Sequence, residues 1–183
     1  MNDNNFTIRP WDGTELDLDR MMDILRDSQR LLDPAFLTTG AGFDRDRWAQ
    51  AVQDQDTEWI LLFASDGHAA GFAGWRLKPI QCHLHALFVA SDYQRRGFGR
   101  AMLRYHWQAA KLREPAIECF TLHVREAAVW AQRLYLAEKY RFYQEGDEAG
   151  WPALRVWIDA CRERGDWPLA PAKRLMYRHG NTM

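Results

Sequence analysis

The arrangement of apolar and polar residues along the chain predicts alternating strands and helices. Short apolar or alternating runs predict strands at 6–11, 58–64, 69–77, 82–89, 116–124 and 174–179. Apolar residues at helical spacing predict helices at 15–32, 97–113, 127–140 and 153–164, and Asp44 can cap a further helix that contains Trp48. Strands that alternate with helices are typical of a mixed central sheet with helices on both faces. We therefore expect an α/β fold of three layers, αβα.

Composition and charge narrow the class of protein. The 183 residues are 47% hydrophobic and 27% charged, which suits one globular domain over residues 1–183. The formal net charge of −1 gives no general attraction to nucleic acid or to a membrane surface. No apolar run approaches the ~20 residues that span a bilayer, and residues 1–5 do not resemble a signal peptide. The three cysteines are widely spaced, so we expect a cytoplasmic protein with neither a disulfide framework nor a metal site.

The segment between strand 82–89 and helix 97–113 has the composition of a phosphate-binding turn. Its residues are Gln94, Arg95, Arg96, Gly97, Phe98, Gly99 and Arg100. Glycines let the backbone approach a ligand closely, and the N–H groups and positive dipole at a helix start favour an anion such as a diphosphate. The P-loop pattern is absent, and Met102 stands where a dinucleotide fingerprint requires glycine. Two glycines alone are more often a turn that binds nothing.

The spacing Gln94-x-x-Gly97-x-Gly99 after an apolar strand resembles the acetyl-CoA motif of the GCN5-related N-acetyltransferase (GNAT) family. The order of elements resembles that family over roughly residues 6–143, and the resemblance is closest over 82–103. It implies that backbone N–H groups from Arg95 to Arg100 hold the pyrophosphate of coenzyme A. It also implies that the preceding strand pairs with the pantetheine arm through the backbone of Leu87, Phe88 and Val89. The expected cofactor is acetyl-CoA, with coenzyme A as product.

Two histidines on strand 82–89 supply a candidate base. Alternate residues of a strand share a face, so His83 and His85 point to one side and Cys82 points to the other. A protonated amine must lose a proton before it attacks a thioester, and an imidazole of pKa near ~6.5 can accept it. The run from His83 to Val89 resembles the strand of arylalkylamine (serotonin) N-acetyltransferases, which implies a proton relay through both imidazoles. The alternatives are two ordinary half-buried histidines, or a metal-dependent hydrolase that adds His123.

A tyrosine on helix 127–140 is the candidate acid. The family pattern N-x-x-A-x-x-L-Y-x-x-x-G-F includes a tyrosine whose phenol can protonate the departing thiolate, and Leu134-Tyr135 resembles it. This chain departs from the pattern, because Ala128 replaces the asparagine and Arg141 the glycine. Phe142 also lies two positions later than expected. Tyr140 is the second candidate for the acid, and a tyrosine on an apolar helix face can equally belong to the core.

Together these features predict an N-acetyltransferase that moves an acetyl group from acetyl-CoA to a primary amine. His83 and His85 are the expected relay and Tyr135 the expected acid. The partner is an amine acceptor, either a small molecule or a protein amine, and a homodimer is left open. Residues 144–173 are a candidate acceptor-side insertion, with acidic and aromatic side chains at Glu145, Asp147, Glu148, Trp151 and Trp157. The alternative is a non-catalytic acyl-CoA-binding module, which the departures at Ala128 and Arg141 favour.

Overall fold

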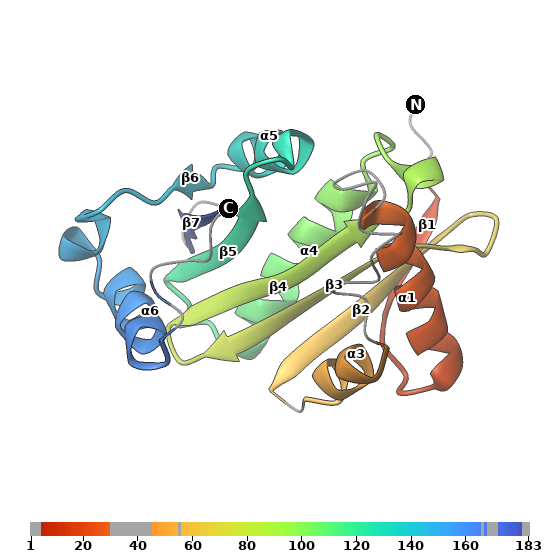
Figure 1. The fold of residues 1–183 in the computed structure, drawn as a ribbon, viewed down its shortest axis with the longest axis horizontal. Helices are drawn as coiled ribbons and strands as arrows, with labels where there is room; N and C mark the ends of the chain where they lie inside the picture. The colour runs from red at the N-terminus through yellow and green to blue at the C-terminus, as the bar shows by residue number, and fades with distance from the viewer. Residues whose placement is uncertain (1–4, 30–44, 55, 166, 168–171, 181–183) are drawn as a thin grey trace. The chain divides into compact units, whose positions relative to one another are not determined.

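The computed structural model describes residues 5–29, 45–54, 56–165, 167 and 172–180. Across these residues seven strands are hydrogen-bonded in the order β1-β2-β3-β4-β5-β7-β6 (Figure 1). The chain forms two compact units, residues 1–76 with 86–107 and residues 77–85 with 108–183. The expected mixed α/β fold is confirmed. None of the helices in these residues is long and apolar enough to cross a membrane.

Each predicted strand and helix that lies within the described residues is present. The strands are β1 (Phe6–Pro10), β2 (Thr57–Ala64), β3 (Ala69–Lys78), β4 (Gln81–Val89), β5 (Cys119–Arg125), β6 (Arg141–Phe142) and β7 (Lys173–His179). The helices are α1 (Glu15–Gln29), α3 (Arg45–Val52), α4 (Phe98–Arg113), α5 (Val129–Ala137) and α6 (Pro152–Glu163), with 3-10 turns η1 (Ser91–Tyr93) and η2 (Asp147–Gly150). The short strand β6 was not predicted, and α5 is shorter than expected at both ends. The predicted cap Asp44 and the end of the first helix, 30–32, lie outside the described residues.

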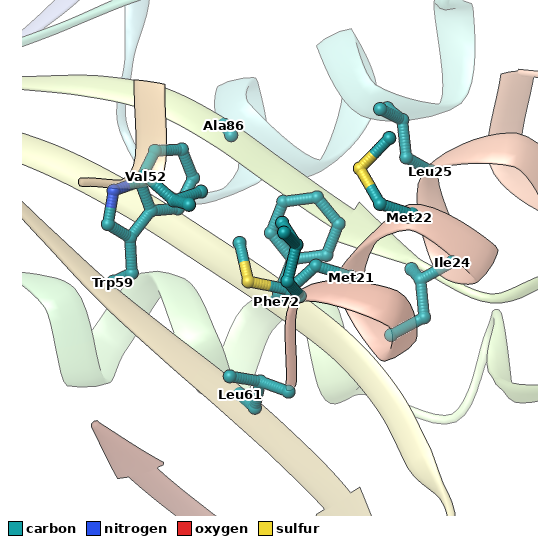
Figure 2. Packing of buried hydrophobic residues seen from close by; sticks show 10 residues of the cluster. Met21, Met22, Ile24, Leu25, Val52, Trp59, Leu61, Phe72 and Ala86 are labelled. Carbon is teal, nitrogen blue, oxygen red and sulfur yellow. The ribbon is translucent and has the colours of Figure 1, made fainter. Parts of the chain in front are cut away.

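In the first unit, helices cover both faces of the antiparallel strands β1, β2 and β3. Phe72 of β3 belongs to an apolar cluster with α1 and α3, in which Figure 2 shows Met21, Trp59 and Phe72 close together. On the other face of β3, Trp75 packs its ring 5.1 Å from the ring of His106 on α4. The alternation of a strand therefore directs successive side chains to different helices, with α1 and α3 in front of the strands and α4 behind them in Figure 1.

The start of α1 is fixed by polar contacts that the sequence pattern did not identify. Thr14 precedes the helix and its Oγ1 accepts a hydrogen bond from the N–H of Asp17 at 3.3 Å, as an N-cap does. The Asp17 carboxylate is fully buried and accepts two hydrogen bonds from Arg9 of β1, at 2.6 and 2.8 Å. Arg20 donates a third at 2.9 Å. The buried charge is thus paired, and it ties the first strand to the first helix.

In the second unit, α6 packs on one face of the strands β4, β5 and β7. The start of β4 pairs in parallel with β5, and β7 pairs antiparallel with both β5 and β6. The apolar cluster under α6 consists of Cys119, Ala153, Leu154, Trp157, Ile158, Cys161, Leu175 and Tyr177. Residue 119 shares its strand face with residues 121 and 123, so α6 covers the face that carries them. The three cysteines, Cys82, Cys119 and Cys161, are buried thiols with no disulfide between them.

Candidate functional site

The glycine turn, residues 94–100, connects η1 to α4 in the first unit. Arg95 has φ 61° and Gly97 has φ 87°, so the backbone twice enters the left-handed region. The side chains of Arg95, Arg96 and Arg100 are exposed, whereas Phe98 is buried and packs its ring against Phe6 and Tyr93. The buried ring of Phe98 therefore anchors the turn, and three exposed arginines add positive charge to it.

The start of α4 leaves several backbone N–H groups of the glycine turn outside the helical hydrogen bonding. Within the described part of the chain, the N–H groups of Arg95, Gly97, Phe98 and Gly99 donate to no protein acceptor, and the first helical bond runs from Ala101 N to Gly97 O at 3.0 Å. These amides lie at the start of a sixteen-residue helix, whose dipole adds positive potential. Such a donor set, with three arginines beside it, fits the linked phosphates of coenzyme A.

Gln94 of the motif holds the turn together from the side. Its side-chain Nε2 donates to the carbonyl of Val89 at 3.1 Å, which closes the chain across η1. The N–H of Ser91 donates to Asp27 of α1 at 2.5 Å, and the Tyr93 hydroxyl donates to Asp66 at 2.7 Å. Gln94 is therefore a residue that positions the turn, and one lone pair of the Val89 carbonyl is already used.

The strand residues before the turn depend on a glycine that the sequence pattern did not single out. Leu87, Phe88 and Val89 are half-buried, and the ring of Phe88 packs 5.2 Å from that of Phe72. A Cβ at Gly71 of β3 would lie 2.8 Å from the Phe88 carbonyl oxygen and 2.8 Å from the Met102 methyl carbon. Gly71 must lack a side chain, because β3, the backbone of Phe88 and α4 meet at this point.

The second unit carries an imidazole cluster, formed by His83, His85 and His123. The ring of His83 lies 5.0 Å from that of His85 and 4.9 Å from that of His123, both edge to face. Trp157 of α6 stacks on His83 at 5.3 Å with 25° between the planes, and also meets His123 at 5.4 Å. His85 is exposed, and His83 and His123 are half-buried. The two histidines expected on one face do share it, and Trp157 contacts one of them, His83.

The register of two parallel strands explains this cluster. His83 of β4 is the partner of Thr121 of β5, and its Nδ1 lies 2.8 Å from the Thr121 Oγ1. His123 follows two positions later on β5, on the same face. Cys82 pairs with Phe120 instead and is fully buried, as expected for the opposite face. Thr121 and His123 could not be attached to the histidine pair from sequence, because nothing local specifies the register of β4 against β5.

The arrangement of these rings differs from a metal site. Among the described residues, no group of three or more His, Cys, Asp or Glu side chains is arranged to hold a metal ion. The three imidazoles meet as ring edges and faces, with Trp157 between helix and sheet. The metal-dependent hydrolase, which required His83, His85 and His123 as ligands, therefore has no geometric support in this part of the chain.

The carboxylates of residues 144–173 are mostly used within their own segment. Glu148 accepts hydrogen bonds from the Tyr143 hydroxyl at 2.6 Å and from the Gly146 N–H at 3.1 Å, and the first of these lowers the pKa of the Glu148 carboxyl. Asp147 accepts from the Gln144 N–H at 2.8 Å. Trp151 stacks on His179 at 3.8 Å. These groups hold η2 and α6 in place, which leaves Trp157 as the aromatic residue that reaches the imidazole cluster.

Tyr135 lies on α5 and is buried, with its ring 5.8 Å from that of Tyr140. Burial raises the pKa of the Tyr135 phenol well above its ordinary value, so the hydroxyl keeps its proton at neutral pH. A phenol in this state can donate a hydrogen bond.

The end of α5 resolves the shifted tyrosine pattern. Lys139 has φ 68°, its N–H donates to Leu136 O, and the N–H of Tyr140 donates to Tyr135 O, each at 3.0 Å. This is a Schellman motif, in which the left-handed position is usually glycine. Lys139 thus occupies the place of the pattern's glycine and the buried Tyr140 that of its phenylalanine. The interpretation that Arg141 replaces the glycine was wrong, because Arg141 belongs to β6, and Tyr135 has the expected spacing.

The fold and the glycine turn together are those of the acyl-CoA N-acyltransferases. The sequence model described as the acetyltransferase (GNAT) family matches residues 18–140, more than half of the chain. The chain belongs to this family and is an acetyl-CoA-dependent acyltransferase, as the turn motif predicted. The match ends before α6, so Trp157 lies beyond the residues that the family model matches.

Solved structures share the fold over nearly the whole chain. A PaiA N-acetyltransferase from Thermoplasma acidophilum, in complex with coenzyme A, has a TM-score of 0.70 at 12% identity and covers 96% of this chain and 99% of its own. The ribosomal-protein-S18-alanine N-acetyltransferase from Escherichia coli has a TM-score of 0.64 at 18% identity, covering 95% and 93%. Spermidine N-acetyltransferase from Vibrio cholerae, in complex with CoA and spermine, has a TM-score of 0.62 at 12% identity, covering 97% of each chain. Among curated proteins, none has a sequence that matches.

Proposed function

We propose that the protein acetylates a primary amine directly, with His83 and His85 relaying the amine proton and Tyr135 protonating the departing thiolate. The observation that carries this proposal is the contact between the two imidazoles, 5.0 Å apart on the strand that continues into residues 87–89. The His-x-His strand supports a relay of the arylalkylamine N-acetyltransferase kind. The polypeptide from 1 to 183 acts as a single acetyltransferase domain in this proposal.

The glycine turn holds the cofactor. Backbone N–H groups from Arg95 to Arg100 bind its linked phosphates, the arginine side chains add charge, and the backbone of Leu87, Phe88 and Val89 pairs with the pantetheine arm. Acetyl-CoA supplies the acetyl group as a thioester: a nitrogen–carbon bond forms, the carbon–sulfur bond breaks, and an acetamide and a thiol result. A backbone N–H near Phe88 polarises the carbonyl group of the acetyl thioester by a hydrogen bond to its oxygen.

The two histidines supply the proton acceptor that the amine requires. His85 is exposed and can take up the proton, while His83 is half-buried and can carry it away from the amine. Only the deprotonated amine has the lone pair that attacks the carbonyl carbon. A base beside the amine therefore accelerates the reaction most where the free amine is scarce, below the pKa of the amine.

Tyr135 supplies the proton that the leaving sulfur needs. Its phenol is buried and its pKa is raised by burial, so it stays protonated throughout the ordinary pH range. The thiol has a pKa near ~8.5, judged from cysteine, and its thiolate can accept a proton from a hydrogen-bonded phenol. The spacing of Tyr135 to the Schellman motif at Lys139 supports this assignment.

The acceptor is a primary amine, of a small molecule or of a protein. Solved relatives include one that acts on spermidine and one that acts on a ribosomal-protein alanine, so the shared fold serves both kinds. We assign residues 144–173 to the acceptor side, because this segment brings Trp157 onto the imidazole cluster. Its aromatic face can also contact the apolar part or the cation of an amine.

The test follows thiol release from acetyl-CoA with a panel of amines as a function of pH. The double variant His83→Ala/His85→Ala should lose rate by roughly 10²–10⁴-fold near pH 7 and recover in alkaline buffer, where the amine deprotonates itself. His68→Ala is the matched control, because His68 is an exposed histidine on the β2–β3 turn and should leave the profile unchanged. An unchanged pH profile in the double variant would rule out the relay. Binding of coenzyme A without turnover on any amine would contradict the proposed N-acetyltransferase activity.

A further inference from the structure

Thr121 contacts the ring of His83 at Nδ1. Its Oγ1 lies 2.8 Å from that nitrogen, and Thr121 is fully buried. The two residues are register partners on the parallel strands β4 and β5, so the backbone itself holds them together. The hydrogen bond at one nitrogen of an imidazole governs which nitrogen carries the proton. A buried hydroxyl at Nδ1 therefore bears on how His83 can act as a base.

The other contacts of His83 keep its ring in one orientation. His85 from β4 and His123 from β5 meet it edge to face, and Trp157 from α6 stacks on it. Of the residues whose contacts with His83 are described here, the two imidazoles are titratable, whereas Thr121 and Trp157 are neutral. Rings on three sides oppose rotation of His83, so Nδ1 stays toward Thr121.

The two neutral tautomers of His83 differ in what proton uptake requires. With the proton on Nε2, the lone pair lies on Nδ1 and accepts from the buried hydroxyl of Thr121, so a proton can reach Nδ1 only after that hydroxyl has turned its hydrogen away. With the proton on Nδ1 and donated to Thr121 Oγ1, the lone pair lies on Nε2. The ring can then gain and lose a proton while the buried hydrogen bond stays intact. An unmade buried hydrogen bond costs about 1–3 kcal/mol, which favours the second route.

We propose that Thr121 is a positioning residue that fixes His83 as the Nδ1–H tautomer, so that Nε2 accepts the proton during acetyl transfer. In that step the proton donor is the amine or the protonated His85. Its N–H bond breaks and leaves the electron pair on the donor nitrogen, while the Nε2 lone pair of His83 forms the new N–H bond. The product is an imidazolium that still donates from Nδ1 to Thr121. The inference rests on the proposed function, because it specifies the state of His83 in the relay named there.

Ring NMR tests the tautomer without any substrate. The ¹³Cδ2 and ring ¹⁵N shifts of a neutral histidine distinguish the two tautomers, and the spectrum of His83→Gln assigns the signals. We expect the Nδ1–H form in the wild type and in Thr121→Ser, which keeps the hydroxyl. Thr121→Val, which has the same shape without a hydroxyl, should lose that form. The Nε2–H form in the wild type would overturn the proposal, even if the valine variant were too unstable to study.

Kinetics separate a positioning role from a structural one. Thr121→Val should lower kcat by roughly 10- to 100-fold near pH 7 with little change in KM, less than removal of a general base costs. The loss should shrink in alkaline buffer, and Thr121→Ser should restore most of the rate. A loss that is equal at every pH, or a wild-type rate in the valine variant, would contradict the inference. If the double histidine variant keeps its pH profile, the proposed function fails, while the NMR result still reports the tautomer by itself.

Discussion

Replacement of Lys139 by glycine should stabilise the protein. Lys139 ends α5 at φ 68°, in the left-handed region that glycine adopts most easily. Its side chain is exposed, so the substitution removes no buried contact. The N–H groups that close the Schellman motif, of Lys139 and Tyr140, belong to the backbone and remain in the variant.

The size of the effect follows from two opposing terms. A non-glycine residue in the left-handed region costs roughly 1–2 kcal/mol. Glycine removes this strain, but its greater conformational freedom in the unfolded chain lowers the free energy of unfolding by about 0.5–1 kcal/mol. The net gain is about 0.5–1 kcal/mol in the free energy of unfolding. For a chain of 183 residues that corresponds to a rise in Tm of roughly 1–4 °C.

Urea unfolding of matched variants measures this difference. Lys139→Ala removes the same charge but keeps a Cβ at the strained position, so it should stay within about 0.5 kcal/mol of the wild type. Arg141→Gly places glycine where sequence alignment alone put it, inside β6 opposite Tyr177, and should destabilise by roughly 0.5–1 kcal/mol. Opposite signs at 139 and 141 are expected. Stabilisation by Arg141→Gly and not by Lys139→Gly would refute the helix end, and with it the spacing that selects Tyr135.

Three further predictions concern the site. Gln94→Glu removes the N–H that donates to Val89 O and should raise KM for acetyl-CoA by roughly 2- to 13-fold, measured by initial rates; an unchanged KM would show that the turn does not need this bond. Because burial raises the pKa of Tyr135, the wild-type kcat should not decline up to about pH 10; Tyr135→Phe should lower kcat at least about 10-fold, whereas equal losses in Tyr140→Phe would speak against the assignment. Trp157→Ala should lower the free energy of unfolding in urea by about 3–5 kcal/mol and should also lower kcat. Trp157→Phe keeps a ring on His83 and should retain more of the stability and more of kcat. Full activity of the alanine variant would exclude a role for α6 in the site.

The raised pKa of Tyr135 also determines in which direction the free energy of unfolding changes at high pH. The folded pKa of Tyr135 lies above its unfolded value of about 10, so the stability linked to this group is present below pH ~10. It is lost as the pH rises through the folded pKa, because the unfolded chain ionises first. Tyr135→Phe should remove this part of the alkaline dependence of the urea midpoint. An identical dependence in both proteins would mean that the phenol is not buried.

Much of the site could be read from local sequence, because local geometry determines it. Gln94, Gly97 and Gly99 lie within six consecutive positions, where a strand end, a turn and a helix start follow from the residues themselves. The shared face of His83 and His85 follows from the period of a strand. These patterns depend on no contact with distant parts of the chain. The family and the cofactor were predicted from the glycine turn, and the fold from the alternation of strands and helices.

Tertiary structure decided which distant residues join those patterns. Thr121, His123 and Trp157 reach His83 through the register of β4 against β5 and the packing of α6, and a shift of one position would turn the β5 side chains to the opposite face. The place of Lys139 was also decided this way, because burial of Tyr140 fixes where α5 ends and obliges a lysine to adopt the conformation of a glycine. The sequence by itself determined the turn, the strand and the histidine pair, since their geometry is set between neighbours. Register and packing depend on energies summed over several elements, and so only the folded chain shows what surrounds His83.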